Sequence, residues 1–331
     1  MSYAIVPCKF ARKAIAFIAS LHRIDKTFLM DHKTCIVIVG PTASGKTKLS
    51  LELAAYFNTE IISADSRQCY RELDIGVAKP DEKELQQIKH YFINSHSIHE
   101  EVNAAVFESY ALNAARIIFE KNDYAIVAGG TGLYVKAFCE GMDEIPSVDE
   151  TIRLSVRKEY EQKGMSWLDN AVKSEDPVFY SRGEIYNPQR MLRALEVKRS
   201  TGTSIVDLHA ATKKNRPFSI IKAGISIPRE KMYAQINDRV DDMIRRGLVD
   251  EARALYPFRS LNALQTVGYQ EIFQYMEGKI TLEKAVEEIR KNTRRYAKRQ
   301  MTWFRKDPEI RWMEKEQGDL FSQVIREVSD K

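Results

Sequence analysis

The residues from Gly40 to Thr47 carry the strongest chemical signal in the sequence. They read GPTASGKT, which matches the pattern GxxxxGK[ST] in full. Glycines let the backbone turn so that amide N–H groups point at phosphate oxygens, and the N-terminus of a following helix adds positive charge. Lys46 supplies a full charge, and the Thr47 hydroxyl can ligate Mg²⁺. The sequence therefore predicts a phosphate-binding site with Mg²⁺ as cofactor, formed by Gly40, Pro41, Thr42, Ala43, Ser44, Gly45, Lys46 and Thr47.

A carboxylate follows the next apolar run of the chain. Residues 60–64 (EIISA) have the composition of a buried strand, and Asp65, Ser66, Arg67 and Gln68 come directly after it. Open α/β sheets bind ligands at the carboxyl ends of their strands, where Asp65 could act as a general base on an acceptor nucleophile. Asp is also favoured as a helix N-cap, so the spacing alone leaves both roles open.

A third apolar run, residues 124–128 (YAIVA), ends without an acidic residue and continues as GGTGLY at residues 129–134. A motor or switch NTPase would end this strand in acidic side chains that organise Mg²⁺ and water, so the sequence argues against that class. We expect instead that the glycines let another substrate approach the backbone closely. The phosphate loop by itself serves kinases, ATPases and transferases alike.

Strands and helices alternate around these motifs, as in βαβ units with a parallel sheet. The predicted strands are apolar throughout, which is typical of a sheet covered on both faces. They are residues 34–39, 60–64, 124–128 and 219–227, and the helices between the first three are residues 48–57 and 107–120. The predicted fold class is α/β, a P-loop NTPase-like parallel sheet flanked by helices, with an α-helical insertion domain.

The predicted insertion is polar and mostly helical. Helices are expected in it at residues 149–163, 165–173 and 188–200, and after the fourth strand at residues 229–246, 248–255, 268–277 and 282–306. We therefore predict a core domain from residues 30–144 and 215–331, ending in basic helices, and an insertion domain from residues 145–214.

The first 29 residues are set apart by their charge, with five basic residues and one acid among apolar ones. An organellar targeting peptide has this character. Because the folded pattern begins directly after Met30, we favour an upstream extension that is not part of the fold. No apolar run approaches the roughly 18–20 residues that span a bilayer. The four cysteines lack metal-site spacing, which suits the reducing cytoplasm, where we expect the protein to lie.

Two helical segments carry basic residues on one side. Gln189, Arg190 and Arg193 fall within one helical turn. Residues 290–306 contain no acid and eight basic residues: Arg290, Lys291, Arg294, Arg295, Lys298, Arg299, Arg305 and Lys306. A charge run can simply be a solvated face. In a chain of net charge +5, one this one-sided favours contact with a nucleic-acid backbone.

Taken together, these segments resemble the tRNA dimethylallyltransferase (tRNA isopentenyltransferase) family in its bacterial form. The matching segments are GPTASGKT at 40–47, ADSRQ at 64–68, GGTGLY at 129–134, NPQRMLRALE at 187–196, QTVGYQE at 265–271 and RRYAKRQMTWFR at 294–305. The resemblance covers about residues 34–312. Cys69 and Gln270 depart from the commoner aliphatic and Lys, and no cysteine follows Cys139, whereas eukaryotic relatives often carry a C-terminal Cys₂His₂ finger.

The resemblance implies transfer of dimethylallyl from its diphosphate to N6 of the adenosine 3′ of the anticodon in tRNA, with release of diphosphate and assistance from Mg²⁺. It implies that Asp65 is the base, that Thr131 lies beside the target base and that Arg239 contacts phosphate. The tRNA-binding residues that it implies are Asp65, Ser66, Arg67, Gln68, Thr131, Arg153, Gln189, Arg190, Met191, Leu192 and Arg193. We expect a monomer whose partners are the anticodon stem-loop and dimethylallyl diphosphate, with no membrane partner.

Rival interpretations stay open at this point. A P-loop kinase would need an adenine pocket and an arginine-rich lid, and it would not explain the basic helix or residues 187–196. An adenylate isopentenyltransferase, acting on a small nucleotide, would need neither the insertion nor that helix. A non-catalytic RNA-binding module is disfavoured because Lys46, Thr47 and Asp65 are all present.

Overall fold

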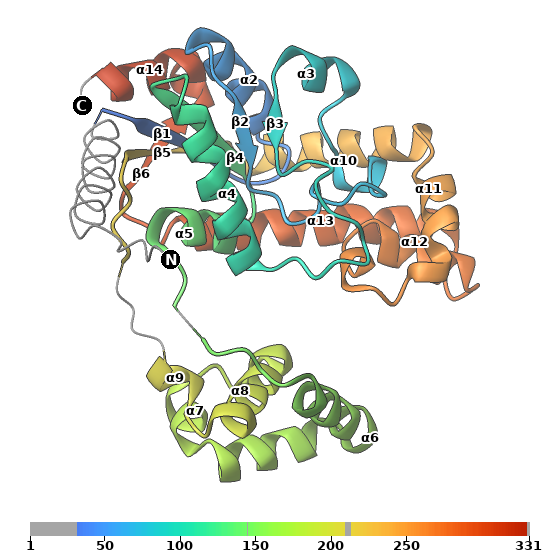
Figure 1. Ribbon diagram of the computed structural model, residues 1–331. Helices are drawn as coiled ribbons and strands as arrows, with labels where there is room; N and C mark the ends of the chain where they lie inside the picture. The colour runs from blue at the N-terminus through green and yellow to red at the C-terminus, as the bar shows by residue number, and fades with distance from the viewer. Residues whose placement is uncertain (1–31, 144, 209–212, 330–331) are drawn as a thin grey trace, which may run out of the picture. The chain divides into compact units, whose positions relative to one another are not determined.

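The computed structural model describes residues 32–143, 145–208 and 213–329 (Figure 1). The extension predicted at residues 1–29 lies outside this part of the chain. Two compact units are present, one from the segments that end at Cys139 and resume at Asn215, and one from Glu140 to Lys214. The second unit thus begins a few residues before the predicted boundary at 145. None of the helices in the described ranges has the length and hydropathy that a bilayer crossing requires.

Six strands form one sheet in the first unit, the core unit, in the order β3-β2-β4-β1-β5-β6, and every pair is parallel. The strands are β1 (Thr34–Val39), β2 (Ile61–Ser63), β3 (His90–Tyr91), β4 (Tyr124–Gly129), β5 (Ser219–Ser226) and β6 (Ile310–Glu314). The predicted α/β fold is confirmed, and the four predicted strands match within one residue at each end. The edge strands β3 and β6 were not predicted.

Helices cover both faces of this sheet (Figure 1). Ile36 and Ile38 of β1 belong to a buried cluster with side chains of α2 (Lys46–Tyr56) and α14 (Leu320–Ser329). Another helix, α4 (Ala104–Phe119), packs on β2 and β4. Burying a side chain of this size stabilises the fold by about 1.5–3 kcal/mol. The packing of β1 in the core therefore fixes the position of the loop that begins at Gly40.

The loops after β1, β2 and β4 leave the sheet at one edge, because these strands are parallel neighbours. Gly129 allows the loops after β2 and β4 to lie close together. A Cβ added there would lie 2.1 Å from the backbone oxygen of Ala64, which no side chain permits. A glycine at this position therefore lets the end of β4 approach the segment that carries Asp65.

Four of the helices that follow β5 in the core unit were predicted. They are α10 (Arg229–Arg245), α11 (Leu248–Leu255), α12 (Tyr269–Met276) and α13 (Leu282–Phe304). The long helix α13 packs against α10 and α12 (Figure 1). Three further helices of the core unit, α3 (Glu82–Gln87), α5 (Gly132–Glu140) and α14, were not predicted, and α5 begins within the GGTG motif.

The second unit is helical, with α6 (Glu150–Glu175), α7 (Pro177–Arg182), α8 (Pro188–Thr201) and α9 (Ile205–Leu208). Gly164, at φ 72° and ψ −165°, interrupts α6 where the sequence predicts the break between two helices. The unit has its own apolar core, which includes Val156, Leu168, Val172, Met191 and Leu195. The first and last residues of this unit lie side by side, since the Lys214 amide donates to the Glu140 backbone oxygen at 2.8 Å.

Candidate active site

The phosphate loop runs from the end of β1 into the first turn of α2. Gly40 and Gly45 have φ values of 150° and 96°, and a Cβ at Gly40 would lie 3.1 Å from Ser44 Oγ. Ser44 is 2% exposed, and its hydroxyl has no hydrogen-bond partner among the described residues. Since a buried hydroxyl without a partner is costly, a bound phosphate oxygen would satisfy it.

Two cations converge on this loop. Lys46 Nζ donates to the backbone oxygens of Gly40 at 3.0 Å and Pro41 at 2.7 Å. Burial lowers the pKa of Lys46 to about 7, nearby Arg239 acts in the same direction, and Asp65 opposes them. Arg239, from α10, donates to Thr42 Oγ1 at 3.1 Å, and burial lowers its pKa too. A polyanion bound here would relieve the repulsion between the two cations.

Asp65 lies beside these cations. Its Oδ1 accepts hydrogen bonds from the amides of Arg67 at 2.8 Å and Gln68 at 3.3 Å, so the carboxylate caps the turn after β2. Among the described residues, no hydrogen bond engages Oδ2. The two interpretations of Asp65 are therefore compatible, because one oxygen caps the turn and the other is available to a substrate.

A cleft of about 690 Å³ joins these groups, a size suited to a small ligand. Thr42–Thr47, Asp65–Gln68 and Arg239 line it, as predicted site residues, and Gly76–Ala78 and Gln265–Gly268 form further walls. From α13 it is lined by Ile289, Thr293, Tyr296, Arg299 and Gln300. The structure thus brings the phosphate loop, the carboxylate and the arginine of α10 into one cavity.

The glycines after β4 give space to protein atoms. A Cβ at Gly130 would lie 2.2 Å from Gln300 Nε2, and one at Gly132 would lie 2.2 Å from Trp303 Cδ1. Side chains of α13 therefore fill the space next to Gly130 and Gly132, while Gly129 and Gly130 also line the cleft.

Thr131, predicted as catalytic, lies between these glycines and holds the β2 loop. Its Oγ1 accepts a hydrogen bond from the Ser66 amide at 3.0 Å, and its own amide donates to Ala64 at 3.2 Å. Tyr296 is also hydrogen-bonded to Thr131, and burial, with a smaller effect of the Asp65 charge, raises the pKa of Tyr296 to about 12. Ser66 and Tyr296 line the cleft, whereas Thr131 itself does not.

Arg67 and Gln68, predicted to bind tRNA, brace the walls of the cleft. Arg67 donates to the Asn262 oxygen at 2.8 Å. Gln68 donates to the Ala78 oxygen at 3.0 Å and accepts from Ser63 Oγ at 3.1 Å. Both side chains therefore hold neighbouring loops in place in this structure.

The sequence and the fold have close counterparts among known proteins. The family profile described as IPP transferase matches residues 68–307. A tRNA dimethylallyltransferase from Christiangramia forsetii is 48% identical over 279 residues, which cover 84% of this chain and 92% of that relative. This chain belongs to the tRNA dimethylallyltransferase family. Another relative of that name, from Cytophaga hutchinsonii, is 46% identical over 281 residues, covering 85% of this chain and 92% of the relative.

Solved structures give the same family. The full-length tRNA isopentenylpyrophosphate transferase of Bacillus halodurans superposes with a TM-score of 0.65 at 35% identity, covering 90% of this chain and 95% of that one. A eukaryotic dimethylallyltransferase acting on tRNA gives a TM-score of 0.72 at 27% identity, covering 85% and 74%. The P-loop NTPase-like fold predicted from the sequence is thus the fold of the family.

In this member of the family, the predicted tRNA-binding residues of α8 divide between surface and core. Gln189 and Arg190 are exposed, and Arg190 pairs with Glu184. Met191 is 0% exposed and Leu192 is 6% exposed, both inside the apolar core of the second unit. The prediction that these two side chains contact tRNA is therefore wrong, because the helix turns them away from solvent.

The other two predicted residues of the second unit lie near the surface. Arg193 is partly exposed and lies 3.7 Å from the buried Glu196 carboxylate, which also has Arg157 at 3.7 Å. Arg153 stands in the first turn of α6 and is partly exposed. Both side chains are therefore partly in contact with solvent.

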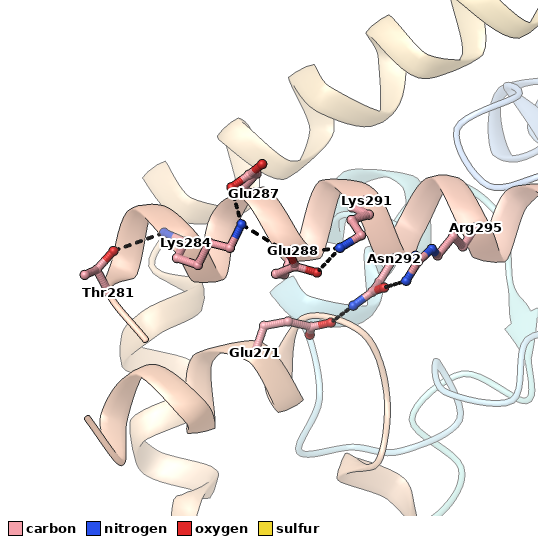
Figure 2. Close-up of polar contacts among 8 residues, drawn as sticks. All are labelled: Glu271, Thr281, Lys284, Glu287, Glu288, Lys291, Asn292 and Arg295. Carbon is pink, nitrogen blue, oxygen red and sulfur yellow. Dashed lines mark hydrogen bonds and ion pairs between the residues drawn. The ribbon is translucent and has the colours of Figure 1, made fainter. Parts of the chain in front are cut away.

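The basic helix α13 of the family has two halves with different partners. Figure 2 shows Lys284 with Glu287 at 2.7 Å, Lys291 with Glu288 at 2.9 Å, and Arg295 bonded to the Asn292 amide oxygen. In the C-terminal half and the two residues that follow the helix, exposed cations have no carboxylate within ion-pair distance in the described part of the chain. These are Arg295, Lys298, Arg299, Arg305 and Lys306. This C-terminal basic surface is where excess positive charge gathers.

Sequence reasoning missed Gln300, which is 6% exposed on α13. Its Oε1 accepts a hydrogen bond from the Thr42 amide at 2.8 Å, and its Nε2 donates to the Gly130 oxygen at 2.9 Å. An uncharged residue inside a basic run gave no signal. The contact joins residues 258 positions apart, so only the folded chain displays it.

Other residues that support the cleft were also missed. Glu251 of α11 accepts the amides of Ile75 at 2.7 Å and Gly76 at 3.0 Å, and Tyr269 donates to the same carboxylate. His90 lies in β3 and lines the cleft, and burial lowers its pKa.

Proposed function

We propose that this chain transfers a dimethylallyl group from dimethylallyl diphosphate to N6 of the adenosine 3′ of the anticodon in tRNA. The observation that carries the proposal is the placement of Lys46, Arg239 and Asp65 in one cleft. A site for a diphosphate anion therefore lies beside a carboxylate that can accept a proton. The names of the relatives, which are tRNA dimethylallyltransferases, support the choice of substrates.

The donor end of the cleft is built for a leaving diphosphate. Lys46 and Arg239 supply positive charge, and the hydroxyls of Thr42 and Ser44 lie in the same loop. As the bond between C1 of the dimethylallyl group and the diphosphate oxygen breaks, negative charge grows on that oxygen. Cations already in place stabilise it without reorganisation, which lowers the barrier.

The acceptor end supplies the base. An exocyclic adenine amine is a weak nucleophile, so we propose that Asp65 Oδ2 accepts the N6 proton as nitrogen bonds to C1. The Arg67 and Gln68 amides fix the carboxylate through Oδ1 during this step. A positioned base of this kind accelerates proton transfer by about 10²–10⁴-fold. The Tyr296 hydroxyl keeps its proton at neutral pH, because its pKa is raised to about 12.

Mg²⁺ is the proposed cofactor. The exposed Thr47 hydroxyl and the Asp65 carboxylate line the same cleft, and both are hard oxygen donors of the type that Mg²⁺ prefers. When bound, the ion would neutralise charge on the diphosphate. Thr47 would hold it, and Lys46 would share the phosphate oxygens with it.

The proposed tRNA contacts fall on both units. In the second unit we assign them to Arg153, Gln189, Arg190 and Arg193. In the core unit we assign them to Ser66, Arg67 and Gln68, which line the cleft, and Thr131 would act through its hydrogen bond to the Ser66 amide. The C-terminal basic surface of α13 would bind the phosphate backbone, since its cations lack acidic partners among the described residues. We further propose that the chain acts as a monomer on one anticodon stem-loop.

The proposal is tested by transfer of labelled dimethylallyl diphosphate into unmodified tRNA. Asp65→Asn keeps an oxygen for the Arg67 and Gln68 amides but removes the base. We expect kcat to fall by about 10²–10⁴-fold with tRNA affinity retained. Phosphoryl transfer from ATP by the wild type, without incorporation of label into tRNA, would overturn the proposal in favour of a kinase.

A further inference from the structure

The Gln300 side chain joins two loops that follow different strands. Its Oε1 accepts from the Thr42 amide in the loop after β1, and its Nε2 donates to the Gly130 oxygen in the loop after β4. Both ends of one amide are therefore used. At 6% exposure, little water competes for these bonds, so their loss would leave polar groups poorly solvated.

Gln300 belongs to one face of α13 that contacts the last three residues of the GGTG segment. Tyr296, four residues earlier, is bonded to Thr131, and Trp303, three residues later, packs on Gly132. Side chains at this spacing lie on the same side of a helix. The helix therefore holds the acceptor-side loop at three consecutive residues, and Gln300 alone of these three also reaches the phosphate loop.

The contact between Gln300 and Gly130 leaves no room for a side chain at position 130. A Cβ there would meet Gln300 Nε2 at 2.2 Å, so the side chain occupies the position that any larger residue would take. At the other end, the Thr42 residue that donates its amide to Gln300 also accepts from Arg239 through its hydroxyl at 3.1 Å. The bridge therefore links the acceptor-side loop to the part of the phosphate loop that meets the second cation.

We propose that Gln300 is a positioning residue that sets the distance between the donor diphosphate and the acceptor amine. The inference rests on the proposed function, because it assigns the loop after β1 to the donor and the loops after β2 and β4 to the acceptor. Thr131 connects the loop after β4 to the loop that carries Asp65, since its hydroxyl accepts a hydrogen bond from the Ser66 amide next to Asp65.

The expected signature is a change in kcat and not in binding. Each loop can still hold its own substrate without the bridge, but the reacting nitrogen and carbon are no longer fixed relative to each other. A misplacement of about 1 Å lowers a rate by about 10²-fold. Binding of either substrate alone does not depend on that distance.

The first experiment replaces Gln300 by Met, which has similar length and no hydrogen-bonding groups of this kind. For Gln300→Met we expect kcat for transfer into tRNA to fall by about 10–10²-fold, with the KM values and the Kd for inorganic pyrophosphate within about threefold of wild type. A pyrophosphate Kd that rises as much as kcat/KM falls would overturn the inference, because Gln300 would then serve the phosphate loop alone.

A second variant tests the bridge at constant shape. In Gln300→Glu, the neutral carboxyl group can accept from the Thr42 amide and donate to the Gly130 oxygen, whereas the ionised form cannot donate. Burial raises the pKa of a carboxyl group. We therefore expect the ratio of the variant's kcat to that of wild type to rise as the pH falls, with no such trend for Gln300→Met. A flat ratio for Gln300→Glu would contradict the bridge.

Thr302→Ala is the matched control, since Thr302 is exposed on the same helix and makes no side-chain hydrogen bond within the described ranges. Its kcat and pyrophosphate Kd should equal those of wild type. The two proposals fail separately. If the wild-type protein transfers no label, the proposed function is contradicted. If the wild type is active and Gln300→Met is equally active, only the proposed role of Gln300 is contradicted.

Discussion

In the core unit, Thr42–Thr47 all face one cleft, whereas in the second unit the segment 187–196 divides between a surface and an apolar core. The difference follows from local geometry. A loop whose glycines adopt positive φ can turn consecutive groups toward one ligand. A helix has 3.6 residues per turn, so adjacent side chains point in different directions. All residues of a loop motif can therefore be assigned the same role from the sequence. In a helical motif, the residues of the exposed face and those of the buried face need separate assignments.

The comparison predicts that variants of the two units fail in different ways. Core variants should change donor binding or chemistry while the second unit stays folded. Variants of α8 should change either the stability of the second unit or the affinity for tRNA, depending on the face.

The largest effect is expected for Lys46→Met. The variant keeps a long side chain but loses the charge beside the leaving diphosphate, so we expect kcat/KM to fall by about 10³-fold or more. Steady-state transfer of label measures it. Lys136→Met, at an exposed position of α5 that does not line the cleft, is the control. Equal activity of the two variants would show that the phosphate loop does not serve the donor.

Met191→Ala should destabilise the second unit by about 2–5 kcal/mol, because it leaves a cavity in that unit's core. Hydrogen exchange of α6–α9 should report the loss, with pyrophosphate affinity unchanged. For the exposed neighbour, Gln189→Ala, a change within about 0.5 kcal/mol is expected. If Met191→Ala also abolished pyrophosphate binding, the stability of the second unit and the function of the core unit would be coupled.

The pH dependence of pyrophosphate binding tests the core unit. The pKa of Lys46 is lowered to about 7 by burial and by Arg239, and a bound anion favours the charged form. The affinity should therefore fall as the pH rises above 7, approaching about tenfold per pH unit. Calorimetry between pH 6 and 9 measures the effect. Lys46→Arg, whose side chain keeps its proton, corrects for ionisation of pyrophosphate itself, and an identical slope in both proteins would refute the assignment.

The smallest effect is expected for Arg190→Gln on the exposed face of α8. Loss of one phosphate contact should weaken tRNA binding by about threefold to tenfold and lower the salt dependence by about one charge. Filter binding at several salt concentrations measures both. Lys284→Gln, whose cation pairs with Glu287, is the control and should leave affinity unchanged. An unaltered slope for Arg190→Gln would remove α8 from the proposed RNA surface.

Much of the core could be predicted because its strands are long apolar runs. β1 and β5 are buried along most of their length, so their composition indicates them directly. β3 has only two residues, His90 and Tyr91, which is too short to show a period. β6 contains Arg311 between apolar residues and depends on pairing with β5, which lies far away in sequence.

The residues of the cleft that come from a single motif were also accessible to sequence reasoning. Those that act across distant segments were not. Gln300 has the same residue type as many surface positions, and its burial depends on Gly130 leaving room for it. Glu251 looks like an ordinary helical acid until the turn at Ile75 folds against it. Such contacts follow from topology and carry no local signature.

The placement of the second unit between Cys139 and Asn215 also has a consequence for how the protein is made. A chain emerges from the ribosome N-terminus first, at about 5–20 residues per second. β1 lies between β4 and β5, so the strand that bears the phosphate loop lacks one neighbour until residue 219 has been synthesised. The helical unit, which has an apolar core of its own, emerges in full before β5. The nascent polypeptide thus completes its helical unit before its core unit, and α13 is the last element of the cleft lining to be synthesised.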